Sequence, residues 1–292
     1  MTTMNTIHLT TLYPILSSIH AEKRDRHIKF IEEGHQYKIT TDPHSTYTSV
    51  TTWNHSHFPK FDSDAVISSM MKGKGWKQGH KYWGLTAEQI KEKWSTNGAS
   101  VSSLGTDMHY NIECFMNNPT LPPHYTHKEL YEYYFTYTSE EEFKETPLEW
   151  QYFIQFVKDT PHLKPYRTEW LIYNEDIKIA GSIDMVYENP DYTLSIYDWK
   201  RSKNITRINL YNHFALNKHI CHMPDSNFWH YALQLNTYKA ILEQKYNKKV
   251  TELKLVRLHP EADEESYELI VLPDLQREIE DLFQEKRMNN NK

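Results

Sequence analysis

Cysteine is scarce in this chain of 292 residues, which contains only Cys114 and Cys221. Two thiols cannot build a framework of several disulfides or a four-thiolate metal cluster, and their scarcity is typical of a reducing compartment. Long apolar runs are missing too: none is long enough to span a bilayer, and no secretory leader pattern stands at the start. We therefore expect an intracellular protein that does not enter a membrane.

Excess positive charge is also absent, because the formal net charge is -6, which argues against a general polyanion binder. The charges are unevenly distributed, however. Acids crowd into 140–149 and 261–285, but none occurs in 65–87 or 199–224. The two acid-free stretches carry these cations: Lys72, Lys74, Lys77, Lys81, Lys200, Arg201, Lys203, Arg207 and Lys218. This distribution predicts one face that attracts a phosphate backbone, unless the stretches are ordinary solvated loops.

The composition, with 38% hydrophobic and 14% aromatic residues, predicts a folded chain that forms a single domain with insertions. Residues 1–25 show no strong periodicity. Strands are predicted in a hairpin over 27–40, over 47–53, from Glu169, and over 177–187, 192–200, 252–258 and 267–272. Helices are predicted over 62–71, 85–94, 102–117, 148–158 and 228–246, and after Pro273.

The most informative stretch consists of the β-type runs 177–187 and 192–200, which a short polar turn separates. Side chains alternate along a strand, so Asp198 and Lys200 project to the same side. Asp184 would come alongside them if the two runs pair as a hairpin. Two carboxylates and one ammonium would then meet at the end of an apolar sheet, which suits a divalent cation and phosphodiester hydrolysis.

The parity of Asp198 strengthens this interpretation. Asp198 lies two and four residues after Ile196 and Leu194, so it shares the face of the strand with these core-type residues. A carboxylate on that face would need a partner or a metal ion. The alternative is a solvated face, which is the usual environment of an Asp-x-Lys pair on a strand.

His109 and Glu113 lie four residues apart on the helix predicted over 102–117, beside its apolar stripe. They are either a surface pair or a metal ligand with a carboxylate behind it. Glu169 either edges its strand or takes part in the same site. The stretch His219-Ile-Cys-His222 invites a zinc interpretation, but no second Cys or His pair at matching spacing completes the ligand set.

The segment 72–83 combines glycines, the cations Lys72, Lys74 and Lys77, and flat rings such as Trp76. Cations on the backbone and rings under the bases are what holds single-stranded nucleic acid. The alternative is a glycine-rich connector without a ligand.

Five short motifs follow one another along the chain: Gly105-Thr-Asp-Met-His109-Tyr-Asn-Ile-Glu113, Glu169 opening a strand, Gly181-Ser-Ile-Asp184, Tyr197-Asp198-Trp-Lys200 and Gln234-Leu-Asn-Thr-Tyr238. In this order they resemble the RecB-type branch of the PD-(D/E)XK nuclease superfamily. The resemblance covers about residues 100–243. The chain is also similar to nucleases of large DNA viruses and phages, through Tyr47-Thr-Ser-Val and Phe61-Asp62.

The resemblance implies an α/β (α+β) fold with a restriction-endonuclease-like core, in which helices flank a central mixed β-sheet. Residues 1–100 would form an N-terminal extension with a β-hairpin and a helical insertion, and residues 101–292 would form the core. A divalent ion would be held by an imidazole, two carboxylates and one main-chain carbonyl, those of His109, Asp184, Asp198 and Trp199.

The resemblance also implies roles for neighbouring side chains. Lys200 would orient and activate the attacking water and relieve negative charge in the transition state. Glu169 would hold a second ion or the water, and Glu113 would support the site from behind. Gln234 and Tyr238 would steady the Lys200 strand or touch a substrate phosphate.

The implied activity is that of a metal-dependent DNA exonuclease or end-processing enzyme in replication, recombination or repair, with one or two Mg²⁺ or Mn²⁺ ions. The imidazole ligand favours manganese. Relatives with four cysteines bind an iron–sulfur cluster, which two cysteines exclude here. Ile183 stands where the family signature has proline. Alternatives are a structure- or site-specific endonuclease and a catalytically silent DNA-binding module.

The expected partners are single-stranded DNA or duplex ends, together with unidentified replication or recombination proteins. The expected location is the host cytoplasm or nucleus if the chain is viral. Besides the residues of 72–83, the expected substrate contacts are Arg201, Lys203 and Arg207.

Overall fold

The computed structural model describes residues 12–263 and 265–290. Its centre is a mixed sheet in the order β3-β5-β6-β7-β8, with β4 paired to β5. The strands are β3 (Thr48–Ser49), β4 (Lys164–Asn174), β5 (Ile179–Glu188), β6 (Leu194–Lys200), β7 (Val250–Arg257) and β8 (Glu268–Val271). A separate antiparallel hairpin joins β1 (Ile28–Ile31) to β2 (Gln36–Ile39). The predicted 27–40 hairpin and the mixed central sheet are confirmed.

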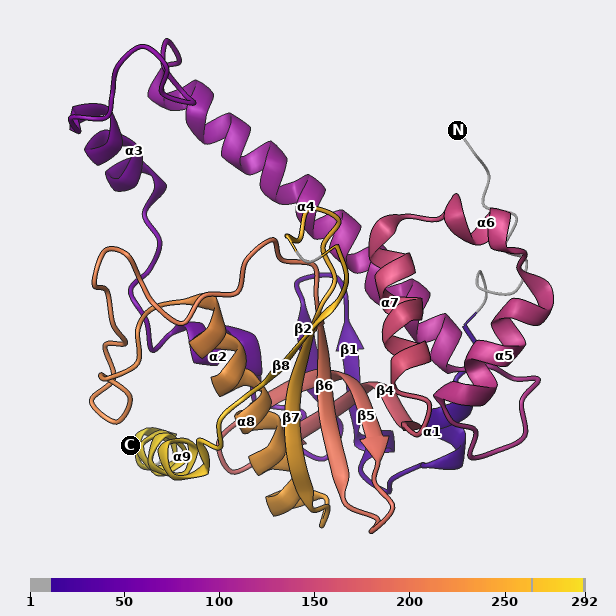
Figure 1. The fold of residues 1–292 in the computed structure, drawn as a ribbon. Helices are drawn as coiled ribbons and strands as arrows, with labels where there is room; N and C mark the ends of the chain where they lie inside the picture. The colour runs from indigo at the N-terminus through magenta and orange to yellow at the C-terminus, as the bar shows by residue number, and fades with distance from the viewer. Residues whose placement is uncertain (1–11, 264, 291–292) are drawn as a thin grey trace.

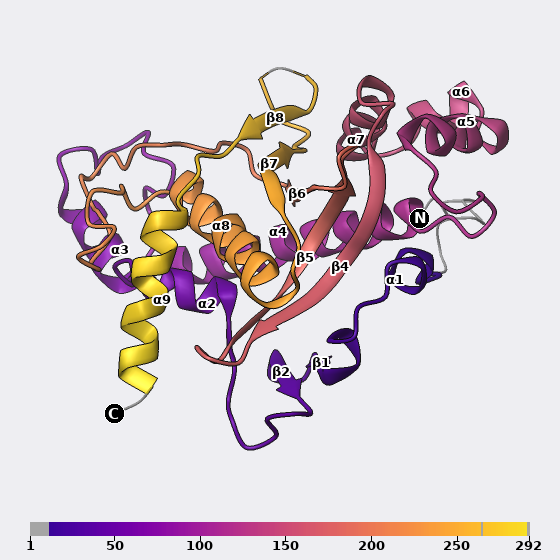
Figure 2. The same cartoon turned by 90° about the horizontal axis from the view of Figure 1, so that it is seen from below.

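Helices cover both faces of this sheet (Figures 1 and 2). One hydrophobic cluster joins the sheet to α2, α8 and α9, another joins it to α1, α5, α7 and the end of α4, and a smaller one joins it to the β1–β2 hairpin. The α-helices are α1 (Ile15–Ile19), α2 (Val50–His55), α3 (Ser63–Lys72), α4 (Ala87–Met116), α5 (His127–Tyr137), α6 (Glu140–Lys144), α7 (Leu148–Asp159), α8 (Asn227–Lys245) and α9 (Gln276–Asn290). A 3₁₀ turn spans Asp25–His27. No helix in the described residues is both long and apolar enough to cross a membrane.

Strand β6 lies at the middle of the sheet and is buried on both faces. Leu194 and Ile196 belong to the cluster under α8, whereas Tyr197 and Trp199 belong to the opposite cluster. A strand covered on both sides reads as a nearly continuous apolar run. The polar residues that interrupt this run are therefore the ones that require an explanation.

Three local predictions are wrong. The expected strand over 47–53 is only Thr48–Ser49, because the Ser49 hydroxyl accepts a hydrogen bond from Thr52 N and caps α2. In this helix Val50 and Trp53 share the buried face.

The two helices predicted over 85–94 and 102–117 are one continuous helix, α4. A Thr86–Gln89 capping box starts it, and no proline interrupts it. Gly98 and Gly105, at about 1 kcal/mol each, only weaken it. The division expected between residues 100 and 101 falls inside this helix. Strand β4 likewise begins at Lys164, so Glu169 lies within it and does not open it.

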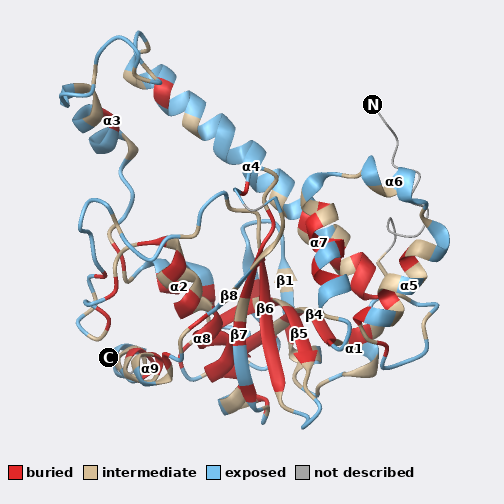
Figure 3. Cartoon of the chain, viewed as in Figure 1, coloured by how far each residue is buried: buried red, intermediate tan, exposed pale blue. Residues whose placement is uncertain are grey.

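The first two-thirds of α4 stand away from the sheet, together with α3 and the connection between them (Figure 1). We call residues 61–104 the arm. Within it only Ile67 and Ile90 are buried, and Figure 3 shows the arm as mostly exposed beside the buried sheet. The last turns of α4 pack on the body through Met108, Ile112 and Phe115, as the predicted stripe requires.

Candidate metal centre

Strands β5 and β6 place two carboxylates side by side. They pair in antiparallel fashion, with Met185 opposite Tyr197, so Asp184 and Asp198 are the next residues on the two strands and share one face. Beyond this point Trp199 N donates a hydrogen bond to Asp184 Oδ2 at 3.2 Å. The hairpin expected from the sequence is thus confirmed, and it brings the two acids together.

Helix α4 supplies the imidazole. His109 Nδ1 lies 3.5 Å from Asp184 Oδ2 and 4.0 Å from Glu169 Oε1. On the other side of the ring, Nε2 lies 2.9 Å from the main-chain carbonyl of Trp199. The ligand atoms of His109, Glu169 and Asp184 all lie within 4.8 Å of one another. Among the described residues, this is the group of His, Cys, Asp and Glu side chains that can hold a metal ion.

Glu169 reaches the centre from β4. Its neighbours Thr168 and Trp170 pair with Met185 and Ile183, so Glu169 lies opposite Asp184. Its φ of 41° is in the left-handed region that a non-glycine residue seldom adopts. Such a backbone conformation is costly and occurs preferentially at functional sites. The Ser182 hydroxyl donates to Glu169 Oε2 at 2.7 Å and fixes the carboxylate.

The carboxylates destabilise one another's charge. Burial, followed by the charge of Asp184, raises the pKa of Glu169 to about 8. The same two causes raise the pKa of Asp198 to about 6, although the Lys200 ammonium acts in the opposite direction. Burial also raises the pKa of Glu113, which adds to the negative potential at Glu169. A cation among these groups would relieve the repulsion.

Asp198 and Lys200 form a buried ion pair. Lys200 Nζ lies 2.5 Å from Asp198 Oδ2, and the two side chains are 17% and 2% exposed. Oδ2 nevertheless accepts no well-aligned hydrogen bond from any described residue. Above the ammonium, the Tyr231 ring centroid is 4.6 Å away. Asp198 therefore faces Lys200 and lies outside the three-residue group that can hold an ion, which contains Glu169 in its stead.

The donor set fits a divalent cation. With Nε2 donating to the Trp199 carbonyl, the lone pair of His109 Nδ1 faces the carboxylates of Asp184 and Glu169, an arrangement that requires either a second ring proton or a cation. Separations of 3.5 and 4.0 Å are long for hydrogen bonds. They match ligands about 2.1 Å from one shared ion. The Trp199 carbonyl, which is expected as a ligand, accepts a hydrogen bond from the imidazole.

Helix α8 closes the centre from one side. Gln234 Nε2 donates to the Tyr238 hydroxyl at 3.1 Å, and burial raises the pKa of Tyr238, which keeps it protonated. Gly181 allows this close approach: a Cβ there would lie 2.8 Å from the Tyr238 ring and 3.1 Å from Val50. Gln234 and Tyr238 thus lie beside the strands of the centre, as the motif order implies.

The expected substrate contacts are spread over two regions. Four of them belong to the arm, at the end of α3 and in the connection from α3 to α4: Lys72, Lys74, Trp76 and Lys77. The other three are near the end of β6. Arg201 is engaged with Glu149 at 2.9 Å and only 10% exposed, Lys203 pairs with Glu261, and Arg207 lies over the Phe228 ring.

The His219–His222 stretch forms no group of metal ligands within residues 12–263 and 265–290. His219 Nδ1 instead lies 3.6 Å from Asp281 on α9.

Sequence reasoning missed two residues of the centre. Ser182 sits two positions before Asp184, and Tyr231 precedes Tyr238 by seven residues, which places both tyrosines on one helical face.

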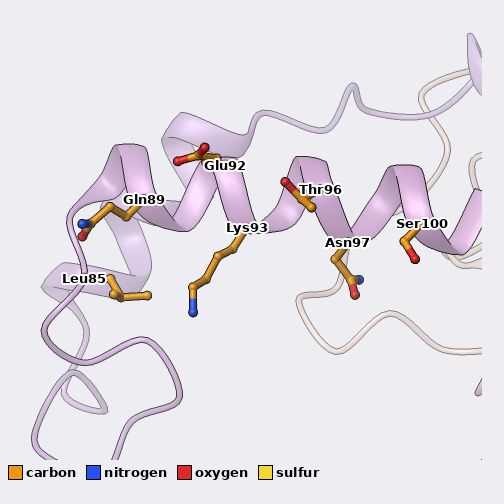
Figure 4. Close-up of a pocket in the computed structure, with 7 residues that line it drawn as sticks. All are labelled: Leu85, Gln89, Glu92, Lys93, Thr96, Asn97 and Ser100. Carbon is orange, nitrogen blue, oxygen red and sulfur yellow. The ribbon is translucent and has the colours of Figure 1, made fainter.

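A surface hollow of about 520 Å³ lies away from this centre, on the arm (Figure 4). It is lined by Leu85, Gln89, Glu92, Lys93, Thr96, Asn97 and Ser100. Its lining offers one carboxylate and no histidine or cysteine. No protein-family model matches this chain, and no curated protein matches it at significant similarity.

Proposed function

We propose that the chain is a metal-dependent deoxyribonuclease of the PD-(D/E)XK type that hydrolyses phosphodiester bonds at DNA ends. The observation that carries the proposal is the meeting of His109, Glu169 and Asp184 beside the buried Asp198–Lys200 pair. One imidazole and carboxylates suit Mg²⁺ or Mn²⁺. An ammonium at the edge of such a site suits chemistry in which negative charge develops on a substrate.

His109, Asp184 and Glu169 would hold the ion. When bound, a divalent ion supplies Lewis-acid stabilisation of the phosphoryl oxygens and lowers the pKa of water. Lys200 keeps its proton: burial disfavours the charge, but the carboxylates of Asp198 and Asp184 outweigh burial and raise the pKa of the ammonium. Lys200 therefore donates hydrogen bonds and positive charge to the phosphate in the transition state, and Asp198 holds it in place.

The order of elements supports the same proposal. An antiparallel β5–β6 pair carries the acids and the lysine, α8 crosses over next, and β7 returns parallel to β6. The five motifs that resemble the RecB-type branch lie on α4, β4, β5, β6 and α8. All five elements contribute a side chain at or beside the centre.

Metal binding is tested first, without reference to activity. Thermal unfolding is followed in EDTA and in Mn²⁺ or Mg²⁺. We expect an ion in 100-fold excess over its Kd to stabilise the wild type by about 2.7 kcal/mol. Asp184→Asn should lose this gain. Asp191→Asn should keep it, because Asp191 lies in the exposed turn of the same hairpin and bonds to Thr193.

Cleavage is tested with end-labelled single-stranded, blunt and overhang DNA in Mn²⁺. We expect the wild type to shorten labelled ends and to leave closed plasmid circles intact. Lys200→Met should abolish cleavage and retain most DNA binding. Nicked circles would indicate an endonuclease, and DNA binding without any cleavage by the wild type would indicate a silent binding module. The proposal is wrong if neither ion supports cleavage of any substrate.

A further inference from the structure

The outer end of the arm is a small packed unit of its own. Ile67 of α3 and Ile90 of α4 are 1% and 0% exposed, and they give the two helices a shared core. Lys91 Nζ pairs with Asp64 at 2.8 Å across the same contact. The first turns of α4 are thus packed against α3, which holds the end of the arm in a defined shape away from the sheet (Figure 1).

This outer end presents cations with few competing acids. Lys72, Lys74, Lys77 and Lys81 are all exposed, and within the described part of the chain none of them forms an ion pair. Trp83, also at this end, keeps 48% of its surface exposed. Unpaired, solvated ammonium groups beside an exposed ring are suited to phosphates and bases.

Helix α4 joins the outer end of the arm, where these cations precede Ala87, to the metal centre at His109. At 1.5 Å per residue, α4 spans about 33 Å from Ala87 to His109. Between them, residues 95–106 carry no charged side chain, so the helix offers two charged ends separated by a neutral stretch. At 3.4 Å per base pair, about 33 Å corresponds to about 10 base pairs of duplex DNA.

We propose that the outer end of the arm is a second DNA-binding site, which holds the phosphate backbone about 10 base pairs from the bond at the metal centre. This inference rests on the proposed function, because it takes DNA as the substrate. The arm would then set a minimum duplex length for tight binding. Shorter duplexes would reach the metal centre without reaching the lysines.

The test compares duplex DNA with stems of 6 and 20 base pairs, each closed by a short loop at one end, bound in EDTA so that nothing is cleaved. The arm variant is Lys74→Ser/Lys77→Ser/Lys81→Ser. The control variant changes the charge equally on the other side of the molecule, at exposed lysines of α5, α6 and α7 (Figure 1): Lys128→Ser/Lys144→Ser/Lys158→Ser.

We expect the arm variant to bind the 20-base-pair stem about 100-fold more weakly than the wild type at 0.1 M salt. The slope of the logarithm of its binding constant against the logarithm of the salt concentration should become shallower by about 0.9 per lost phosphate contact. Binding of the 6-base-pair stem should change less than about 2-fold, because that stem does not span the arm. The control variant should bind both stems like the wild type.

Equal weakening for both stems, or an equal effect of the control variant, would overturn the inference, since either result indicates a general charge effect. An unchanged affinity for the long stem would overturn it as well. These outcomes are separate from those of the proposed function. If the arm variant weakens binding of the long stem only, and the wild type cleaves nothing in Mn²⁺, the second site stands and the nuclease activity is refuted. If the wild type cleaves DNA but the arm variant affects both stems equally, the nuclease activity stands and the second site is refuted.

Discussion

The Asp198–Lys200 pair offers a direct measure of the electrostatics of the centre. The perturbation is a double-mutant cycle in EDTA made of Asp198→Asn, Lys200→Met and the double variant. At 2.5 Å and an effective dielectric constant of 20, the two charges attract by about 7 kcal/mol before desolvation is subtracted. Removing one partner of a buried pair typically costs about 3 to 5 kcal/mol, because the other charge is left unpaired.

Protonation limits the cost of Lys200→Met. Without the ammonium the Asp198 carboxyl takes up a proton, and protonating a group whose ordinary pKa is 3.8 costs about 4 kcal/mol at pH 7. The free energy of unfolding should therefore fall by about 3 to 4 kcal/mol in each single variant. The double variant should lose less than about 2 kcal/mol, because its two neutral side chains leave no buried charge.

Urea unfolding followed by tryptophan fluorescence measures these free energies. A matched control is the cycle Asp64→Asn and Lys91→Met on the arm, whose side chains are 74% and 52% exposed at a similar separation of 2.8 Å. These losses imply a coupling of at least about 4 kcal/mol at Asp198–Lys200, and we expect a much smaller coupling at the exposed pair. A coupling at Asp198–Lys200 no larger than that at the exposed pair would refute the claim that the Lys200 ammonium is held by a buried carboxylate.

Three further variants test the surroundings of the centre. Gly181→Ala should lower the free energy of unfolding by about 1 to 3 kcal/mol and weaken the Mn²⁺-dependent shift in Tm, because a Cβ there would lie 2.8 Å from the Tyr238 ring. Tyr238→Phe should cost about 1 kcal/mol in urea unfolding through the lost hydrogen bond from Gln234. Burial lowers the pKa of His127 to about 3, so the unfolded chain binds more protons below pH 6.5 and stability falls as the pH drops from there towards 3. Acid titration of the Tm should therefore show a shallower fall in His127→Gln than in the wild type.

The parts of the centre that lie on one hairpin could be predicted from the sequence. Alternation along a strand assigns Asp198 and Lys200 to one face, and the antiparallel pairing then places Asp184 beside them. These relations are local, because they need only the strand period and one short turn. Helical spacing likewise assigns Met108 and Ile112 to the buried face of α4.

The parts that depend on distant contacts could not be predicted in the same way. Glu169 becomes a neighbour of His109 only through the pairing of β4 with β5 and an unusual φ of 41°. The continuity of α4 through residues 95–106 was missed for a different reason. Its serines and glycines have weak helix propensity, and the end of the helix is stabilised by tertiary packing that no local pattern contains.

The arrangement of charge at the centre is itself an argument for a ligand. Besides burial, the charges of Asp184, Glu113 and Asp198 act on the Glu169 carboxylate, and those of Asp198 and Asp184 act on the Lys200 ammonium. The imidazole of His109 turns its Nδ1 toward Asp184 and Glu169. Apolar residues of similar size would spare the chain this repulsion, because buried charges are weak contributors to stability. A structural role alone gives no reason to gather four acids in one part of the sheet. The divalent cation of the proposed function gives one, since it would convert the repulsion into coordination and leave Lys200 as the positive charge available to a phosphate.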